Sequence, residues 1–91
     1  MEAPEKIRDW LKLVLGGLVS SPDSIVIDIK SDEQGVLFIV KVDENDRGKV
    51  IGKKGSIAEA LRVITRSAGR LIDIRTSMKI EAPGSRFAPI D

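Results

Sequence analysis

The stretch Gly48-Lys49-Val50-Ile51-Gly52-Lys53-Lys54-Gly55-Ser56-Ile57 decides the fold of this 91-residue chain. It places two glycines around two lysines, after an apolar pair and before an amphipathic segment. Glycine lets a backbone turn sharply and approach another backbone closely, because it has no Cβ. The lysines add positive charge and N–H donors at the tip. The stretch therefore predicts a tight loop that suits a phosphate-bearing strand as its partner.

The composition excludes most catalytic chemistry. The chain has no cysteine, no histidine and no tyrosine, which rules out disulfides, the usual zinc sites and Ser-His-Asp arrangements. We therefore expect no enzyme, no metal and no cofactor. With 42% hydrophobic residues, a chain of this length predicts one small domain with a modest core. No secretory signal or membrane-spanning run is present, so a cytoplasmic protein is expected.

Charge is distributed unevenly along the chain. Residues 1–46 contain five basic and ten acidic side chains, whereas residues 47–79 contain nine basic and two acidic ones. The net charge of +1 hides this separation. A basic segment centred on the glycine loop is the polarity expected where one face meets an acidic polymer.

Apolar periodicity predicts a helix and two strands in the first half of the chain. Ile7, Trp10, Leu11, Val14, Leu15 and Leu18 follow the period of an amphipathic helix over residues 5–19. Residues 24–31 alternate as a half-buried strand does. A polar hairpin loop leads to a second strand over residues 36–42. The apolar run of this strand is nearly continuous. It predicts either that the strand lies in the middle of the sheet or that a partner covers its second face.

Two helices and a last strand are expected in the second half. Residues 47–51 form a short helical piece before the loop. Ser56 and Glu59 have the spacing of a capping box at the start of the next helix, and Gly69 is expected to end it. A third strand is expected over residues 71–80. The buried stripe of the second helix is expected to be Ile57, Ala60, Leu61, Ile64 and Ala68.

These elements predict an α+β fold with the order α-β-β-α-α-β, in which helices cover one face of a three-stranded sheet. We expect one domain over residues 1–81 and a flexible C-terminal tail over residues 82–91, which contains two prolines and a glycine. Trp10 and Phe38 are expected in the core. Phe87 lies in the tail, and nothing decides whether it docks on the domain or on a partner.

With this order of elements, Val50-Ile51-Gly52-Lys53-Lys54-Gly55 resembles the GXXG loop of KH domains. The loop lies between two helices, as that family requires. One helix and two strands precede it and one strand follows, which resembles the bacterial, type II form of the KH fold. The chain is hardly longer than such a domain. It is similar to the small single-KH RNA-binding proteins of bacteria, of the KhpA type.

The resemblance implies non-catalytic binding of single-stranded RNA, in bacterial RNA regulation or as an RNA chaperone. In KH domains the loop holds the nucleic-acid backbone, and an adjacent apolar groove accepts about four nucleotides. Aromatic residues make up only 3% of the chain, so base stacking on aromatic platforms fits poorly. The residues expected to contact RNA are Arg47, Lys49, Val50, Ile51, Gly52, Lys53, Lys54, Gly55, Ser56, Arg62 and Arg66.

Several alternatives stay open at this point. Arg62, Arg66 and Arg70 fit a solvated basic face as well as they fit phosphate contacts. Glu44 and Asp46 precede a helix, where carboxylates are usually caps and only seldom metal ligands. The resemblance also implies a homodimer and a heteromer with a larger KH-containing protein. Rival functions are a protein–protein scaffold on a KH fold and the binding of single-stranded DNA.

Overall fold

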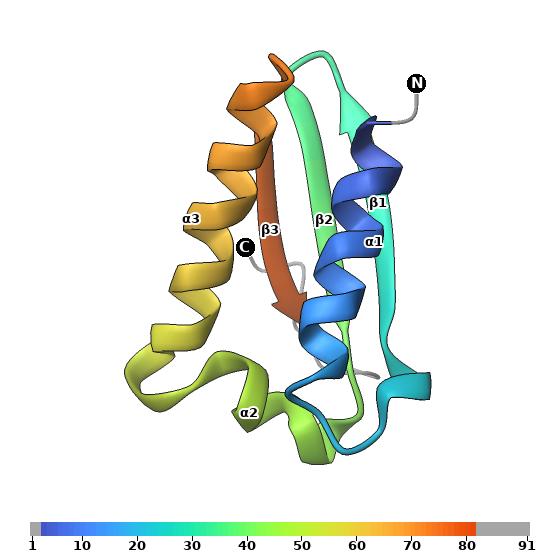
Figure 1. Ribbon diagram of the computed structural model, residues 1–91, viewed down its shortest axis with the longest axis vertical. Helices are drawn as coiled ribbons and strands as arrows, with labels where there is room; N and C mark the ends of the chain where they lie inside the picture. The colour runs from blue at the N-terminus through green and yellow to red at the C-terminus, as the bar shows by residue number, and fades with distance from the viewer. Residues whose placement is uncertain (1–2, 82–91) are drawn as a thin grey trace.

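A three-stranded sheet forms one layer of the molecule, and helices cover one of its faces (Figure 1). The computed structural model describes residues 3–81. Three short 3-10 turns, Pro22–Ser24, Glu44–Asp46 and Lys53–Gly55, join longer elements. The predicted α+β class, element order and single covered face are confirmed. In chain order the longer elements are α1 (Ala3–Gly16), β1 (Val26–Asp32), β2 (Gly35–Lys41), α2 (Arg47–Ile51), α3 (Ser56–Leu71) and β3 (Thr76–Glu81).

Strand β2 lies in the middle of the sheet, between β1 and β3. It pairs with β1 in antiparallel and with β3 in parallel register, so that Phe38 stands opposite both Ile29 and Met78. A two-residue turn suffices for the antiparallel pair, whereas a parallel pair needs a long crossover. That crossover contains α2, the glycine loop and α3. The position in the middle of the sheet, one of the two alternatives predicted from the apolar run of β2, is therefore confirmed.

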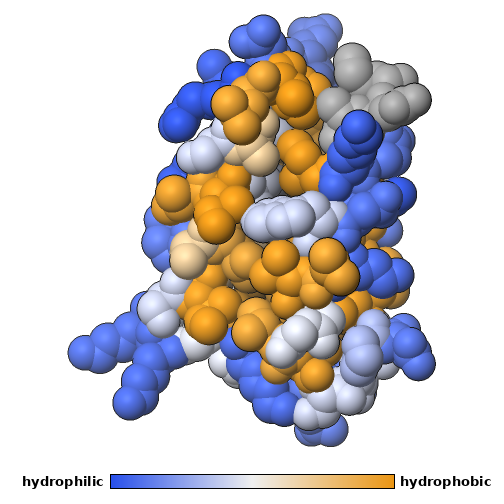
Figure 2. Space-filling view, viewed as in Figure 1, coloured by the Kyte–Doolittle hydropathy of each residue, from blue (hydrophilic) through white to orange (hydrophobic). Residues whose placement is uncertain are grey.

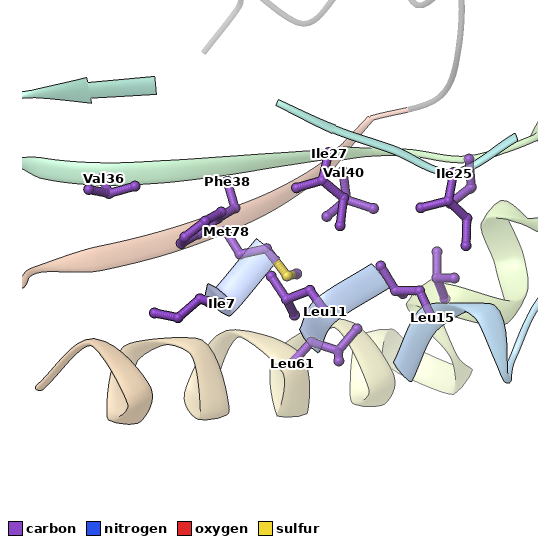
Figure 3. Packing of buried hydrophobic residues seen from close by; sticks show 12 residues of the cluster. Ile7, Leu11, Leu15, Ile25, Ile27, Val36, Phe38, Val40, Leu61 and Met78 are labelled. Carbon is purple, nitrogen blue, oxygen red and sulfur yellow. The ribbon is translucent and has the colours of Figure 1, made fainter. Parts of the chain in front are cut away.

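The core lies between the sheet and helices α1 and α3. Figure 3 shows Leu11 of α1 and Leu61 of α3 pointing toward the sheet, where Phe38 and Val40 face them. Phe38, Leu11 and Val40 are fully buried, as their positions in the predicted stripes require. Trp10 is an exception, since 38% of its surface is exposed. The core position expected for Trp10 is wrong, and the indole lies at the edge of the α1 stripe.

Two helix ends differ from the sequence-based prediction. Helix α1 ends at Gly16 rather than near residue 19, since two consecutive glycines weaken its last turn. Helix α3 passes through Gly69 and continues to Leu71. A Cβ on Gly69 would lie 2.3 Å from Thr76 Oγ1 and 2.5 Å from the Ile74 carbonyl oxygen. This glycine therefore serves close packing between α3 and the start of β3, and does not end the helix.

The buried face of α3 is rotated from the predicted stripe. Ala60 and Ile64 are exposed. The helix approaches the sheet through small or compact side chains. One of them is Thr65, whose hydroxyl is satisfied because Oγ1 donates to the Leu61 carbonyl at 2.7 Å. Thr76 Oγ1 donates in turn to the Thr65 carbonyl at 2.7 Å. The buried residues of α3 are Ala58, Leu61, Thr65 and Gly69.

Strand β3 begins at Thr76, five residues later than predicted. Residues 72–75 form a turn instead, in which the Ile74 N–H donates to the Gly69 carbonyl at 2.8 Å and the Asp73 N–H to the Arg70 carbonyl at 3.2 Å. Asp73 has a φ of 60° there. The helical hydrogen bonding of α3 thus continues into a tight turn before the chain extends.

The predicted tail over residues 82–91, including Phe87, lies outside the described residues. The domain boundary at residue 81 remains a prediction for the same reason. Within residues 3–81, no helix combines the length and the apolarity needed to cross a membrane.

The packing of α3 on β3 gives a matched pair of stability predictions. Gly69→Ala should lower the free energy of unfolding by about 1–3 kcal/mol, because the added methyl overlaps backbone as well as side-chain atoms. Gly48→Ala adds a methyl to helix α2 with no atom within 4 Å. That control should leave stability unchanged or raise it by about 0.5–1 kcal/mol. Urea unfolding followed by circular dichroism measures both. Equal effects of the two substitutions would contradict the packing role of Gly69.

Candidate nucleic-acid interface

The loop between α2 and α3 adopts backbone conformations that suit glycine. Gly52 has φ 79° and ψ 174°, a combination almost restricted to glycine. Gly55 has φ 77° and ψ 15°, in the left-handed region. Lys54, between them, is also left-handed, with φ 55°. The chain therefore reverses direction within four residues, and the two glycines make that reversal possible.

Gly52 is constrained by space as well as by dihedral angle. A Cβ there would lie 2.4 Å from Ile57 Cγ1 and 2.9 Å from the Ile57 nitrogen. No atom lies within 4 Å of the corresponding position at Gly55. Gly52 thus holds the loop tightly against the first turn of α3, while Gly55 leaves open space beside the backbone. The open position is where another backbone can approach.

Lys53 and Lys54 stand at the exposed tip of this loop. Neither forms an ion pair with any of residues 3–81. Figure 2 shows hydrophilic side chains projecting from the turn between α2 and α3, at the lower left of the view. Beside them, the first turn of α3 carries the partial positive charge of a helix N-terminus. The tip therefore concentrates positive charge on an accessible surface.

A buried carboxylate fixes α2 and hence one side of the loop. Asp46 is 1% exposed, and its two carboxylate oxygens accept hydrogen bonds from the Ser20 and Ser21 N–H groups, each at 3.0 Å. The Lys49 ammonium lies 3.4 Å from Asp46 Oδ1. These bonds tie the start of α2 to the segment between α1 and β1. The Ser20 hydrogen bond is the largest cause that lowers the pKa of Asp46 below 3.8, and burial opposes it.

Two of the residues expected to contact RNA, Val50 and Lys49, make contacts within the protein that differ from the predicted role. Val50 is fully buried in the core cluster, so it supports α2 from beneath and cannot be the exposed floor of a groove. Ile51 is only partly buried and packs on the same cluster. The Lys49 ammonium donates to Ser20 Oγ and pairs with Asp46. Its charge is thereby partly compensated within the protein, although Lys49, like Arg47, is exposed.

The expected capping box at the start of α3 is wrong. The N-cap residue is Gly55, and no side chain caps this helix end. Ser56 already has helical angles, with φ −66° and ψ −39°. Glu59 instead pairs with Arg62 at 3.6 Å and with Arg66 at 3.9 Å. No side chain therefore caps this helix end, although the Ser56 N–H donates to the Lys53 carbonyl within the loop.

The acidic residues before α2 are caps and anchors in the described structure. The Asp43 carboxylate accepts from the Asn45 N–H at 2.9 Å. Asp46 binds backbone N–H groups as above. Within residues 3–81, no group of three or more potential metal ligands comes together. Two features of the structure escape the sequence pattern. One is the Asp46 anchor, which joins residues 26 positions apart. The other is Arg75, at the opposite end of α3 from the loop, which lines a surface hollow with Arg66 and Arg70.

Comparison with known proteins places the same region within one family. The family model described as KhpA/KhpB, KH domain, matches residues 8–80, from α1 to β3. The protein named RNA-binding protein KhpA in Clostridium acetobutylicum is 36% identical over 62 residues, which cover 68% of this chain and 83% of that protein. Its namesake in Aquifex aeolicus is 36% identical over 74 residues, covering 81% and 94%. The Listeria monocytogenes namesake is 32% identical over 74 residues, covering 81% and 97%.

The Asp46 anchor predicts a pH-dependent contribution to stability. Its pKa is lower in the folded protein than the ordinary 3.8, so ionised Asp46 stabilises the fold fully above that value. The contribution is lost as the pH falls from 3.8 through the folded pKa. Asp46→Asn should therefore unfold at lower urea concentration than the wild type at pH 7, and the difference should shrink at pH 3. Asp43→Asn, at an exposed cap, is the control. A difference that stays constant with pH would contradict this role.

Proposed function

The chain belongs to the KhpA/KhpB KH-domain family, and on this premise we propose that it binds single-stranded RNA through the loop Gly52–Gly55, without catalysis. The observation that carries the proposal is the loop itself. Two glycines with positive φ turn the backbone at an accessible helix junction. The two lysines at its tip form no ion pair within residues 3–81. The curated relatives are named RNA-binding proteins, which supports RNA as the ligand.

The loop would hold the phosphate backbone in three ways. The open side of Gly55 admits a strand close to the main chain. The first turn of α3, which no side chain caps, would favour an anion through the partial positive charge of the helix N-terminus. Lys53 and Lys54 add Coulomb attraction, which salt screens because both side chains are exposed. Binding should therefore weaken as the salt concentration rises.

Bases would then lie against the apolar side of the loop junction. Ile51 and Ile57 are partly exposed next to Gly52, and both pack on the core cluster beneath. Val50 contributes only as support. The described residues of this junction contain no aromatic side chain, so bases would be held by apolar contact rather than by stacking on rings. About four nucleotides fit such a groove in KH domains.

Arg47, Ser56, Arg62 and Arg66 complete the proposed contact surface. Arg62 and Arg66 are 39% and 46% exposed, so both can reach solvent although Glu59 partly neutralises them. We assign the chain a role in bacterial RNA regulation or RNA chaperoning in the cytoplasm. The family membership and the bacterial relatives support this role.

We also propose that the protein forms a homodimer, through the exposed apolar flank of α3. Ile64 is 47% exposed and Leu71 is 87% exposed, and Ala60 lies on the same flank. Figure 2 shows hydrophobic side chains gathered over α3 and across to α1. A surface of this kind usually marks an interaction site. One KH site binds weakly, and two linked sites would raise the affinity for a long RNA. A larger KH-containing protein is the other partner proposed for the same surface.

Reversing the charge at the loop tip tests the RNA site. Lys53→Asp/Lys54→Asp should lower the affinity for a single-stranded RNA dodecamer by about tenfold or more at 0.1 M salt, because phosphate attraction becomes repulsion. Fluorescence anisotropy with a labelled RNA measures the change. Lys6→Asp/Lys12→Asp, on the exposed face of α1, applies the same charge change away from the loop.

The control should lose much less affinity, and circular dichroism should show both double variants folded. If Lys53→Asp/Lys54→Asp keeps its affinity for RNA, the hypothesis of a protein–protein scaffold replaces the hypothesis of RNA binding through the loop. Competition by a DNA dodecamer of matched sequence distinguishes the two nucleic acids, since they differ mainly in the 2′-OH. Equal competition by DNA would make single-stranded nucleic acid in general the ligand.

One substitution on the exposed apolar flank of α3 tests the proposed dimer. Ile64→Asp should shift the protein from dimer to monomer in equilibrium sedimentation, because a charge would enter an apolar interface. Val26→Asp is the control: Val26 is 49% exposed and lies in β1, on the side of the sheet away from the helices. A wild-type protein that sediments as a monomer at high micromolar concentration would refute the homodimer.

A further inference from the structure

The face of the sheet that turns away from the helices carries an apolar strip. Because Val36, Phe38 and Val40 belong to the core on the helix side, the residues between them, Leu37 and Ile39, point outward. Helices α1 and α3 both lie on the other side of the sheet (Figure 1). Ile39 is nevertheless only 6% exposed, and Leu37 is partly buried. We call these two side chains the outer strip.

Charged side chains frame the outer strip on both sides. Lys41 pairs with Asp28 at 3.2 Å. Lys79 pairs with Glu81 at the same distance. Lys30, which stands opposite the Leu37 end of the strip, forms no ion pair with any of residues 3–81. The framing residues are Asp28, Lys30, Lys41, Ser77, Lys79 and Glu81.

The segment that follows β3 begins beside the outer strip. Strand β3 ends at Glu81, which stands opposite Lys41 on the outer face. The next ten residues read Ala82-Pro83-Gly84-Ser85-Arg86-Phe87-Ala88-Pro89-Ile90-Asp91 and lie outside the described residues. Proline and glycine at the two middle positions of a turn are the signature of type II. The sequence therefore predicts that residues 82–85 reverse the chain directly after β3.

The apolar residues of this segment have the spacing of the outer strip. The fourth residue of such a turn is level with the first, and an extended chain then runs back along the sheet at about 3.3 Å per residue. By this count Phe87 comes within one residue of the row that contains Ile39. Ile90 falls in the row that contains Leu37. One extended segment can therefore cover both side chains of the strip.

The charges of the segment meet opposite charges in the same register. Arg86 is level with Glu81 by the same count. Asp91 lies one residue past the row of Leu37, where the Lys30 ammonium has no carboxylate among residues 3–81. The tether to β3 also gives the segment a high effective concentration at this face, which favours it over a separate partner with equal contacts.

We propose that residues 82–91 fold back over the outer face of the sheet and cover the outer strip with Phe87 and Ile90. This inference goes beyond RNA binding and does not depend on it. In place of the flexible tail expected from its composition, the segment forms an ordered cover, because burial of apolar surface favours contact. Helix α3 lies on the other side of the sheet, so the cover leaves the apolar and basic flanks of that helix free.

Nuclear Overhauser contacts in the 91-residue chain test this cover. The Phe87 ring protons should give cross-peaks to the methyl groups of Leu37 and Ile39. The chain contains two phenylalanines, one tryptophan and no tyrosine, and Phe38 lies in the core on the helix side. An aromatic contact on the outer strip therefore reports Phe87. Phe87→Leu should remove these cross-peaks, and Phe87→Ser/Ile90→Ser should change the methyl chemical shifts of both strip residues.

A matched variant and an isotope mixture give each outcome a meaning. Trp10→Leu removes a partly exposed ring from α1 and should leave the methyl shifts of Leu37 and Ile39 unchanged. In a mixture of ¹³C-labelled and unlabelled chains, the contacts should arise within one copy. Contacts between copies would mean that a second copy's segment covers the strip, and would overturn the proposal. The absence of any contact from Phe87 to the two strip residues would overturn it as well.

Discussion

The parallel pairing of β2 with β3 is the constraint on which the rest of the structure depends. A chain that leaves one end of β2 must return to the other end before it can run parallel to it. Here α3 makes that return along the sheet, and Gly69 lets its last turns touch β3. The glycine loop is the point where the crossover reverses direction. The exposed backbone of the loop therefore follows from the topology. Asp46 fixes helix α2, which forms one side of the loop.

Helix α3 has three faces of different chemical character. Its compact residues, such as Thr65 and Gly69, face the sheet. The flank with Ile64 and Leu71 is apolar and exposed, and the flank with Arg66 and Arg70 is basic. Because the apolar and basic flanks lie on opposite sides of the buried face, a partner on one leaves the other free. One helix can therefore serve association and RNA binding together.

The sequence predicts the order of elements and the loop because both rest on local patterns. Alternation marks β1, and glycine spacing marks Gly52 and Gly55. The burial of α3 is predicted only in part: Leu61 is buried as expected, whereas Ala60 and Ile64 are exposed. Periodicity counts apolar residues, but the contact with β3 depends on a missing Cβ at Gly69 and a hydrogen-bonded hydroxyl at Thr65. The Asp46 anchor joins segments far apart in the chain, and no local pattern reveals such a bond.

The chemistry of the interface has a consequence for RNA selection. Phosphate contacts position a strand, whereas contacts to base edges read its sequence. In the proposed interface, the lysines of the loop and the arginines of α3 would contact phosphates. Ile51 and Ile57, which would lie beside the bases in the proposed interface, have no side-chain hydrogen-bonding groups with which to distinguish one base edge from another. A single domain of this kind would therefore select single strands of sufficient length, and discrimination between sequences would have to come from a second protein on the apolar flank.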